Sequence, residues 1–181
     1  MEESAFLHPG KAVAAAGIHE GLKVADFGAG AGFFTRAAAR AVGESGVVWA
    51  VDINRELLPR IKNLASSEGL NNVEVLHGDI EKAGGTSLPA GTFDFVLLTN
   101  VLFSLEDRGE CLAEMRRVLK NTGRALVIDW SGSFGGLGPH PDHIITQEKA
   151  QKLFEQHGFS IGPKVDAGAY HWGFVVRKKS A

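Results

Sequence analysis

Apolar and polar residues alternate along the chain in short blocks. Five apolar runs predict strands that are covered on both faces, as in a parallel sheet; they span residues 24–27, 47–51, 73–76, 93–98 and 124–129. Helix-compatible segments lie between or beside these runs, at residues 10–18, 33–41, 55–68, 107–119 and 146–157. Two further strands, at residues 159–165 and 170–178, are separated by Gly168, which indicates a hairpin. The pattern predicts an α/β fold: a doubly wound, mostly parallel seven-stranded sheet with an antiparallel last strand and helices on both faces.

Turn-forming residues mark where these elements should end. Asn121-Thr122-Gly123 is expected to form the turn before the strand at 124–129. Asn54 is placed to cap the helix that follows the second strand, and Thr146 to cap the helix at 146–157. We expect one domain over residues 1–181. Its N-terminal segment, 1–21, contains a short helix after Pro9 and is a candidate lid, as is the glycine- and proline-rich loop 131–143.

Composition narrows the class of protein. The chain has 181 residues, 44% of them apolar and 22% charged, and its formal net charge is −2. This near-neutral balance predicts no nucleic-acid partner. No apolar run approaches the roughly 18 residues of a membrane span, and acids stand near the N-terminus where a signal peptide would be basic, so a cytoplasmic location is expected. The single cysteine, Cys111, allows no intrachain disulfide and is expected to pack in a helix.

A glycine-rich segment follows the first predicted strand. Asp26 stands two residues before Gly28, and glycine recurs at Gly30 and Gly32. Strand, glycine turn and helix form the first half of a nucleotide-binding unit, in which the bare backbone lets a ligand approach closely. The third glycine comes one residue earlier than in the dinucleotide fingerprint, and Phe33 takes that position. The P-loop pattern is also absent.

Polar residues follow the next strands at the edge where such sheets bind ligands. Asp52 closes the second strand, 24 residues after Gly28, where a carboxylate can accept hydrogen bonds from both hydroxyls of a ribose. Asp79 follows the third strand in Gly78-Asp79-Ile80, and Asn100 follows the fourth.

The segment D-x-G-x-G-x-G after a first strand resembles motif I of the class I S-adenosylmethionine-dependent methyltransferases. The resemblance covers almost the whole chain and implies that Gly28, Ala29 and Gly30 cradle the amino-acid end of S-adenosyl-L-methionine. It implies that Asp26 serves the α-ammonium group and that Ile53 lies against the adenine. Asp79 would accept from the exocyclic amine, Ile80 would pack on the ring after Gly78, and Asn100 would face the methyl-donating sulfur. Methyltransferases that act on the amines of nucleic acids have prolines directly after the residue at this position, and this sequence has none there.

The acceptor side carries histidines and a tyrosine. If the last strand is antiparallel, Tyr170, His171 and Trp172 should lie opposite His140 and His143, beside the expected methyl group. His140, His143, Tyr170 and His171 are candidates for substrate binding. No catalytic residue can be named from the sequence; His171, His143, Tyr170 and Asp129 are the candidates for a base. The spacing of the histidines matches no known set of metal ligands, so no metal site is expected.

Three functions remain open at this stage. The leading hypothesis is direct displacement of a methyl group onto a small-molecule acceptor, with the protein supplying alignment and exclusion of water. A cofactor-binding partner subunit without catalytic activity is the alternative. A nicotinamide-dependent oxidoreductase is less favoured, because the third glycine comes early and Tyr170 has phenylalanine, not lysine, four residues later.

Overall fold

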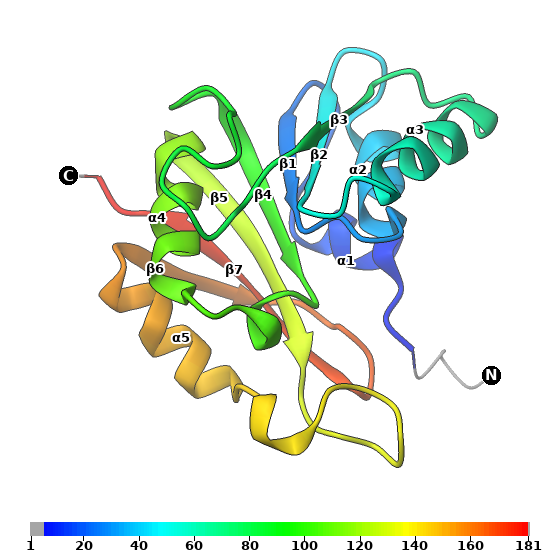
Figure 1. Ribbon diagram of the computed structural model, residues 1–181. Helices are drawn as coiled ribbons and strands as arrows, with labels where there is room; N and C mark the ends of the chain where they lie inside the picture. Colours follow the sequence, from blue (N-terminus) through cyan, green and yellow to red (C-terminus); the bar gives the residue numbers. More distant parts are fainter. Residues whose placement is uncertain (1–5, 181) are drawn as a thin grey trace.

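The computed structural model describes residues 6–180 and contains a seven-stranded sheet with the strand order β3-β2-β1-β4-β5-β7-β6 (Figure 1). Neighbours from β3 through β5 are parallel, whereas β7 is antiparallel to both β5 and β6. The predicted α/β sheet with its antiparallel last strand is confirmed. The strands are β1 Lys23–Phe27, β2 Val47–Asp52, β3 Val73–His77, β4 Phe93–Thr99, β5 Leu119–Trp130, β6 Phe159–Lys164 and β7 His171–Lys178.

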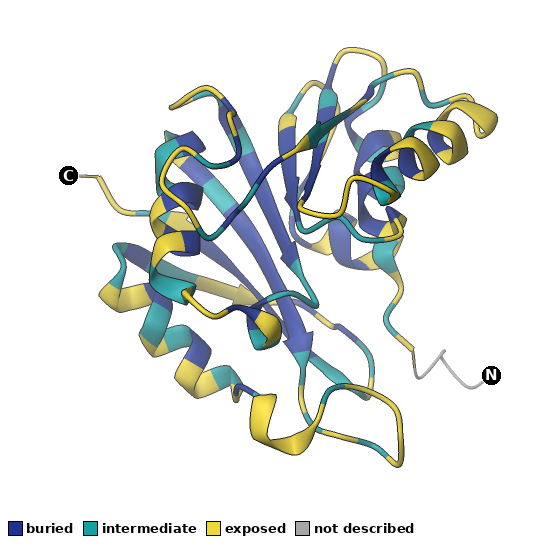
Figure 2. Ribbon diagram, viewed as in Figure 1, coloured by how far each residue is buried: buried dark blue, intermediate teal, exposed yellow. Residues whose placement is uncertain are grey.

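Helices cover both faces of the sheet (Figure 1). The α-helices are α1 Pro9–Ala15, α2 Phe33–Val42, α3 Leu57–Ser67, α4 Arg108–Val118 and α5 Gln147–Gln156. The first three pack in one apolar cluster with residues of the sheet, and α4 and α5 pack in a second cluster on the other face. Figure 2 shows the central strands as the buried layer between them, whereas the edge strands β3 and β6 are partly exposed. In β4, four consecutive residues from Phe95 to Leu98 are fully buried, as the unbroken apolar run predicts.

The expected turn at residues 121–123 is wrong. α4 ends at Val118, and β5 begins at once with Leu119 and continues to Trp130. Phe93 pairs with Leu119 and Phe95 with Arg124, so a step of two residues on β4 matches a step of five on β5. Because of this irregular pairing, Asn121, Thr122 and Gly123 lie within the strand instead of forming a turn. The propensity for a turn was therefore overridden by pairing with β4.

Other boundaries differ by a few residues. α1 ends at Ala15 rather than residue 18, because Gly17 adopts φ +83° and turns the chain. α3 begins at Leu57, and Asn54 accepts from the backbone N–H of Glu56 in the turn before it rather than capping the helix. Thr146 caps α5 as expected, accepting from the N–H of Lys149.

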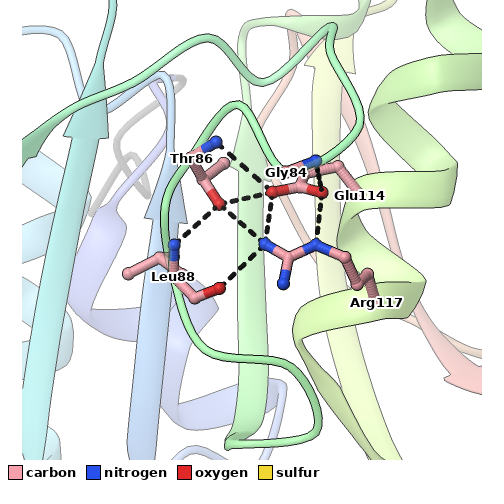
Figure 3. A network of polar contacts seen from close by, with 5 residues as sticks. All are labelled: Gly84, Thr86, Leu88, Glu114 and Arg117. Carbon is pink, nitrogen blue, oxygen red and sulfur yellow. Dashed lines mark hydrogen bonds and ion pairs between the residues drawn. The ribbon is translucent and has the colours of Figure 1, made fainter.

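A buried ion pair fastens the loop that follows β3 (Figure 3). The Glu114 carboxylate on α4 accepts hydrogen bonds from the backbone N–H groups of Gly84 (2.9 Å) and Thr86 (3.3 Å) and from the Thr86 hydroxyl. Arg117 lies one turn later, bonds Glu114 at 2.7 Å, and donates to the carbonyl of Leu88 at 2.8 Å. The loop is thereby held against α4, which fixes the backbone next to Asp79.

Among residues 6–180, no helix has the length and apolar character needed to cross a membrane.

Candidate active site

The glycine turn connects β1 to α2 and depends on backbone conformations that glycine favours. Gly28, Gly30 and Gly32 have φ values of +69°, +55° and +76°. A Cβ atom on Gly28 would lie 2.7 Å from Cγ2 of Val101, so this position is restricted by space as well as by conformation. The backbone N–H of Gly28 donates to the carbonyl of Val51 at 2.9 Å, which anchors the turn to β2.

The Asp52 carboxylate ties the end of β2 to this turn. One oxygen accepts from the N–H of Gly30 at 2.9 Å, and the other accepts from the N–H of Asn54 at 2.8 Å. Each carboxylate oxygen can accept more than one hydrogen bond, so Asp52 keeps capacity for a ligand. Asp52 therefore contacts the glycine turn, although it lies far from Gly28 in the sequence.

Asp52 lies in the lining of a cavity of about 340 Å³ at the carboxyl ends of the strands. This cavity, called here the adenosine-side cavity, brings together the residues predicted for the adenosine half of the cofactor, namely Asp52, Ile53, Gly78, Asp79 and Ile80, with Gly28, which was predicted for the amino-acid end. Ile53 is 65% exposed and so presents apolar surface to a ligand. The N–H of Glu81 donates to Asp79 and, together with nearby Lys82, keeps the pKa of that carboxyl below its usual value.

A second cavity, of about 560 Å³, lies on the other side of Gly28 and is called the acceptor-side cavity. The glycine turn and Asn100 form one part of its lining, and Phe6, Phe33, Trp130 and His171 contribute much of the rest. No charged side chain of the described residues lines it. Gly28 belongs to both cavities, so they meet at the glycine turn.

Asn100 adopts a strained backbone conformation beside this turn. Its φ is +58°, in the left-handed region, and its N–H donates to the carbonyl of Ile128 at 2.8 Å. Its side-chain Oδ1 is buried and has no hydrogen-bond partner among the described residues. A strained residue with an unpaired polar atom is characteristic of ligand sites rather than of structural turns.

Asp26 is buried directly before the glycine turn. Its Oδ2 accepts from the Thr35 hydroxyl at 2.6 Å, whereas Oδ1 has no partner among the described residues. Burial raises the pKa of Asp26 to about 6, the hydrogen bond from Thr35 opposes this effect, and the negative charge of Asp52 adds to it. A cationic group of a ligand would favour the ionised form of this carboxyl.

The acceptor-side candidates do not all meet. His171 lines the acceptor-side cavity, where its ring packs on Trp130 with centroids 4.2 Å apart. Tyr170 packs instead between Phe6 and Phe134, at 5.5 and 4.9 Å. This contact joins the start of β7 to the N-terminal segment and to the glycine-rich loop, the two candidate lids.

His140 and His143 lie apart from this cavity, contrary to the expected cluster. Their ring centroids are 6.1 Å apart in an edge-to-face arrangement, but His143 lines a different cavity, beside α5, and His140 is 67% exposed. Trp172 is not opposite them either, since it is buried and its Nε1 donates to the carbonyl of Ile145. The path of loop 131–143, which no periodic pattern encodes, accounts for the difference.

Asp129, the remaining candidate base, is fully buried. Its carboxylate accepts from the N–H groups of Phe103 (3.1 Å) and Trp130 (2.8 Å). Burial raises its pKa to about 6, and these hydrogen bonds counteract part of that rise. Asp129 therefore organises the backbone at the ends of β4 and β5 and does not line either cavity.

Several lining residues were not predicted from the sequence, and three of them are the most prominent. Phe33 and Trp130 present aromatic surface to the acceptor-side cavity, and Val101 fills the space above Gly28. Two of them could have been found from position alone, because Phe33 begins the helix after the glycine turn and Trp130 ends a strand. Within residues 6–180, no three acidic, histidine or cysteine side chains are grouped as a metal site would require.

Comparisons with known proteins identify the class. The profile of a family described as "Methyltransferase domain" matches residues 18–158. Ubiquinone/menaquinone biosynthesis C-methyltransferases UbiE are 31% identical in Paraburkholderia xenovorans and in Cronobacter sakazakii, over 88% and 86% of this chain. The chain spans about three fifths of the length of these curated relatives, 61% and 59%.

A solved structure shows the same class. A SAM-dependent methyltransferase from Aquifex aeolicus superposes with a TM-score of 0.87 at 30% identity, covering 96% of this chain and 90% of its own. The chain therefore belongs to the S-adenosylmethionine-dependent methyltransferases. S-adenosyl-L-methionine is the cofactor of this family, and the residues present fit it. Gly28 stands where a Cβ would meet Val101, so the turn keeps a bare backbone beside both cavities, and Asp26 and Asn100 each hold a buried oxygen without a partner among the described residues.

Proposed function

We propose that the protein binds S-adenosyl-L-methionine across the two joined cavities and catalyses transfer of its methyl group to a small-molecule acceptor. The observation that carries the proposal is the shared position of Gly28, which places the adenosine-side cavity and the acceptor-side cavity on either side of one glycine turn. A ligand with a nucleoside at one end and a reactive group at the other suits this arrangement. Family membership supports the same conclusion.

Each part of the cofactor has a proposed partner in the chain. Asp52 would accept from the ribose hydroxyls, and Asp79 would accept from the adenine amine while Ile53 and Ile80 pack on the ring. The glycine turn and Asp26 would hold the amino-acid end. Asn100 would support the cofactor through its backbone or orient the acceptor through its amide. When bound, the cofactor supplies an activated methyl group that needs no further activation by the protein.

The chain's own part in the reaction is to align the acceptor and to exclude water. Phe33 and Trp130 present flat apolar surface on the acceptor side, and Phe6 lines the same cavity. The cavity volume of about 560 Å³ and its uncharged lining favour a small apolar acceptor. The relatives' printed names, which concern the biosynthesis of ubiquinone and menaquinone, support a small-molecule acceptor without identifying it here.

Calorimetry on the whole chain tests the cofactor assignment. S-adenosylmethionine and S-adenosylhomocysteine should bind, and NADH should not. Asp52→Ala should weaken both sulfur ligands by roughly 10- to 100-fold, since a hydrogen bond to a charged group contributes about 1.5–3 kcal/mol. Asp94→Asn is the matched control, because the Asp94 carboxylate accepts from the N–H of Lys23, at the start of β1 and thus at the opposite edge of the sheet.

Binding of NADH in preference to the sulfur ligands would refute the proposal. Unchanged affinity in Asp52→Ala would show that the cofactor does not use the end of β2. Transfer of a labelled methyl group to a panel of small aromatic and aliphatic acceptors then distinguishes an enzyme from a binding subunit. Absence of transfer to any acceptor, together with a co-purifying methyltransferase, would favour the binding subunit.

A further inference from the structure

His171 occupies a distinctive position in the acceptor-side cavity. It is the first residue of β7 and pairs with Trp130, the last residue of β5, so both side chains project from the same face of the sheet. The imidazole packs on the indole at 4.2 Å with an angle of 37° between the planes. The cross-strand pair holds the ring at the cavity wall, and β7 positions it more firmly than a loop would.

Neither ring nitrogen of His171 has a partner among the described residues. Nδ1 and Nε2 are both buried and both lack a hydrogen bond. A buried polar group without a partner costs about 1–3 kcal/mol, so native proteins rarely leave one without a reason. A neutral imidazole offers one acceptor and one donor, and both are uncommitted here.

The surroundings of His171 contain no charge that would fix its protonation state. Burial is the cause that lowers the pKa of its imidazole, with no contribution from a neighbouring charge. Tyr170, the adjacent titratable residue, packs into the cluster with Phe6 and Phe134. Asp129 pairs opposite Trp172 and so projects from the other face of the sheet, and the His8 imidazole caps α1 by accepting from Lys11. His171 is therefore neutral at pH 7 and able to accept a proton.

We propose that His171 is the proton acceptor of the acceptor site, and that the cavity takes a planar aromatic molecule bearing a hydroxyl group. The proposal rests on the methyltransferase function proposed above. The hydroxyl O–H bond breaks, its proton bonds to the free imidazole nitrogen, and the electron pair stays on oxygen, giving a phenolate beside an imidazolium. Nothing else is consumed.

The surroundings favour both the aromatic ring and the ion pair. Phe33 and Trp130 provide flat apolar contacts for a planar ring, and apart from His171 itself the described lining offers no acidic or basic side chain to bind a charged acceptor. Burial disfavours a lone imidazolium because the positive charge has no partner. A phenolate formed next to the ring supplies that partner, so the two charges form together or not at all. The resulting oxygen is a stronger nucleophile, and it also activates the aromatic carbons next to it.

The test uses 4-nitrophenol as the probe, without cofactor, because its phenolate absorbs at a wavelength where the phenol does not. Difference absorbance is recorded below the pKa of the free probe for the wild type and two variants. His171→Gln keeps hydrogen bonding but cannot take a proton, and His171→Phe keeps the stacking on Trp130. His19→Phe is the control, since His19 is exposed and its ring bonds the carbonyl of Glu20.

Wild type and His19→Phe should bind the probe with at least a tenfold higher phenolate-to-phenol ratio than in free solution. His171→Gln should bind it as the phenol, and His171→Phe should bind it weakly and as the phenol. Phenolate formation by either His171 variant at the wild-type level would overturn the assignment, as would binding to the wild type without ionisation. No binding to the wild type at millimolar probe would overturn the aromatic acceptor class.

Calorimetry with S-adenosylhomocysteine separates this proposal from the function on which it rests. Both His171 variants should still bind S-adenosylhomocysteine, which also shows that they are folded. If the wild type fails to bind the cofactor, the proposed function fails, and the probe experiment still decides whether His171 accepts a proton. If the cofactor binds and the probe is never ionised, only the role of His171 is refuted.

Discussion

Replacing Glu114 by glutamine should destabilise the protein more than any exposed substitution. The carboxylate is fully buried and holds Gly84, Thr86 and Arg117 at once (Figure 3). Glutamine is nearly the same size, but it presents an N–H₂ group to neighbours that are themselves donors. The substitution therefore removes accepted hydrogen bonds and leaves the Arg117 guanidinium without its counter-charge.

Two separate considerations give similar values for the stability lost in Glu114→Gln. Removing one partner of a buried ion pair costs about 3–5 kcal/mol, and the 32% exposure of the Arg117 side chain argues for the lower end. In addition, hydrogen bonds from Arg117, Thr86 and Gly84 outweigh burial and lower the pKa of Glu114 from 4.5 to about 2. That difference corresponds to roughly 3 kcal/mol of stability at 1.36 kcal/mol per pKa unit.

The free energy of unfolding, measured by urea titration at pH 7, should fall by roughly 3 kcal/mol in Glu114→Gln. The thermal midpoint should drop by about 6–12 °C, since a chain of this size loses about 2–4 °C per kcal/mol. Glu74→Gln is the control, because it breaks an ion pair with Lys62 in which the lysine and glutamate side chains are 40% and 48% exposed. It should cost less than about 1 kcal/mol.

The pH dependence gives a second measurement of the same pair. A carboxyl with a depressed pKa stabilises the folded state above its unfolded pKa, and this contribution is lost as the pH falls toward the folded value. Wild type should therefore lose the Glu114 contribution between about pH 4.5 and pH 2, and Glu114→Gln should lack that loss. Equal stability of wild type and Glu114→Gln at pH 7, or the same acid sensitivity in both, would refute the reasoning.

Three further predictions concern the glycine turn and the buried acids. Gly28→Ala should abolish measurable cofactor binding by calorimetry, whereas Gly69→Ala, with φ +75° but nothing within 4 Å of the added Cβ, should reduce only stability. Cofactor affinity of the wild type should fall about tenfold per pH unit below pH 6, because the cationic ligand requires ionised Asp26; calorimetry on Asp26→Asn should show no such slope. The pKa of Asp129 is raised to about 6 in the folded protein, so as the pH falls the folded protein binds this proton at a higher pH than the unfolded chain does. Urea titrations should therefore show stability rising from about pH 7 toward about pH 4 in the wild type and rising less in Asp129→Asn.

Features encoded by neighbouring residues were predictable from the sequence. Five apolar runs and the hairpin signal at Gly168 located all seven strands to within a few residues, except at the start of β5. The glycine turn was equally clear, because left-handed backbone at Gly28, Gly30 and Gly32 requires the residue type that stands there. The convergence of Asp52 and Asp79 on one cavity also followed, since parallel strands bring their carboxyl ends to the same edge.

Features that depend on contacts between distant segments were not predictable. The start of β5 depends on pairing with β4 and on the contact of Lys120 with Asp94 at 2.6 Å. The separation of His143 from His171 depends on the course of loop 131–143, whose glycines permit many conformations. The Glu114 network is invisible in the sequence, where its acid and arginine look like an ordinary helical pair one turn apart.

The unpaired polar atoms argue that the carboxyl edge of the sheet is shaped for a ligand. Buried side-chain atoms without a hydrogen bond occur in four described residues: Asp26, Arg36, Asn100 and His171. Arg36 is compensated by Glu68, whose carboxylate lies 3.1 Å from its Nε. The other three stand at the glycine turn or line the acceptor-side cavity beside it, and Asn100 also carries backbone strain. The other buried polar side-chain atoms of the described residues have hydrogen-bond partners. Three residues with unpaired buried atoms at one edge of the sheet would only destabilise the fold, so a ligand that pairs with them is the consistent explanation.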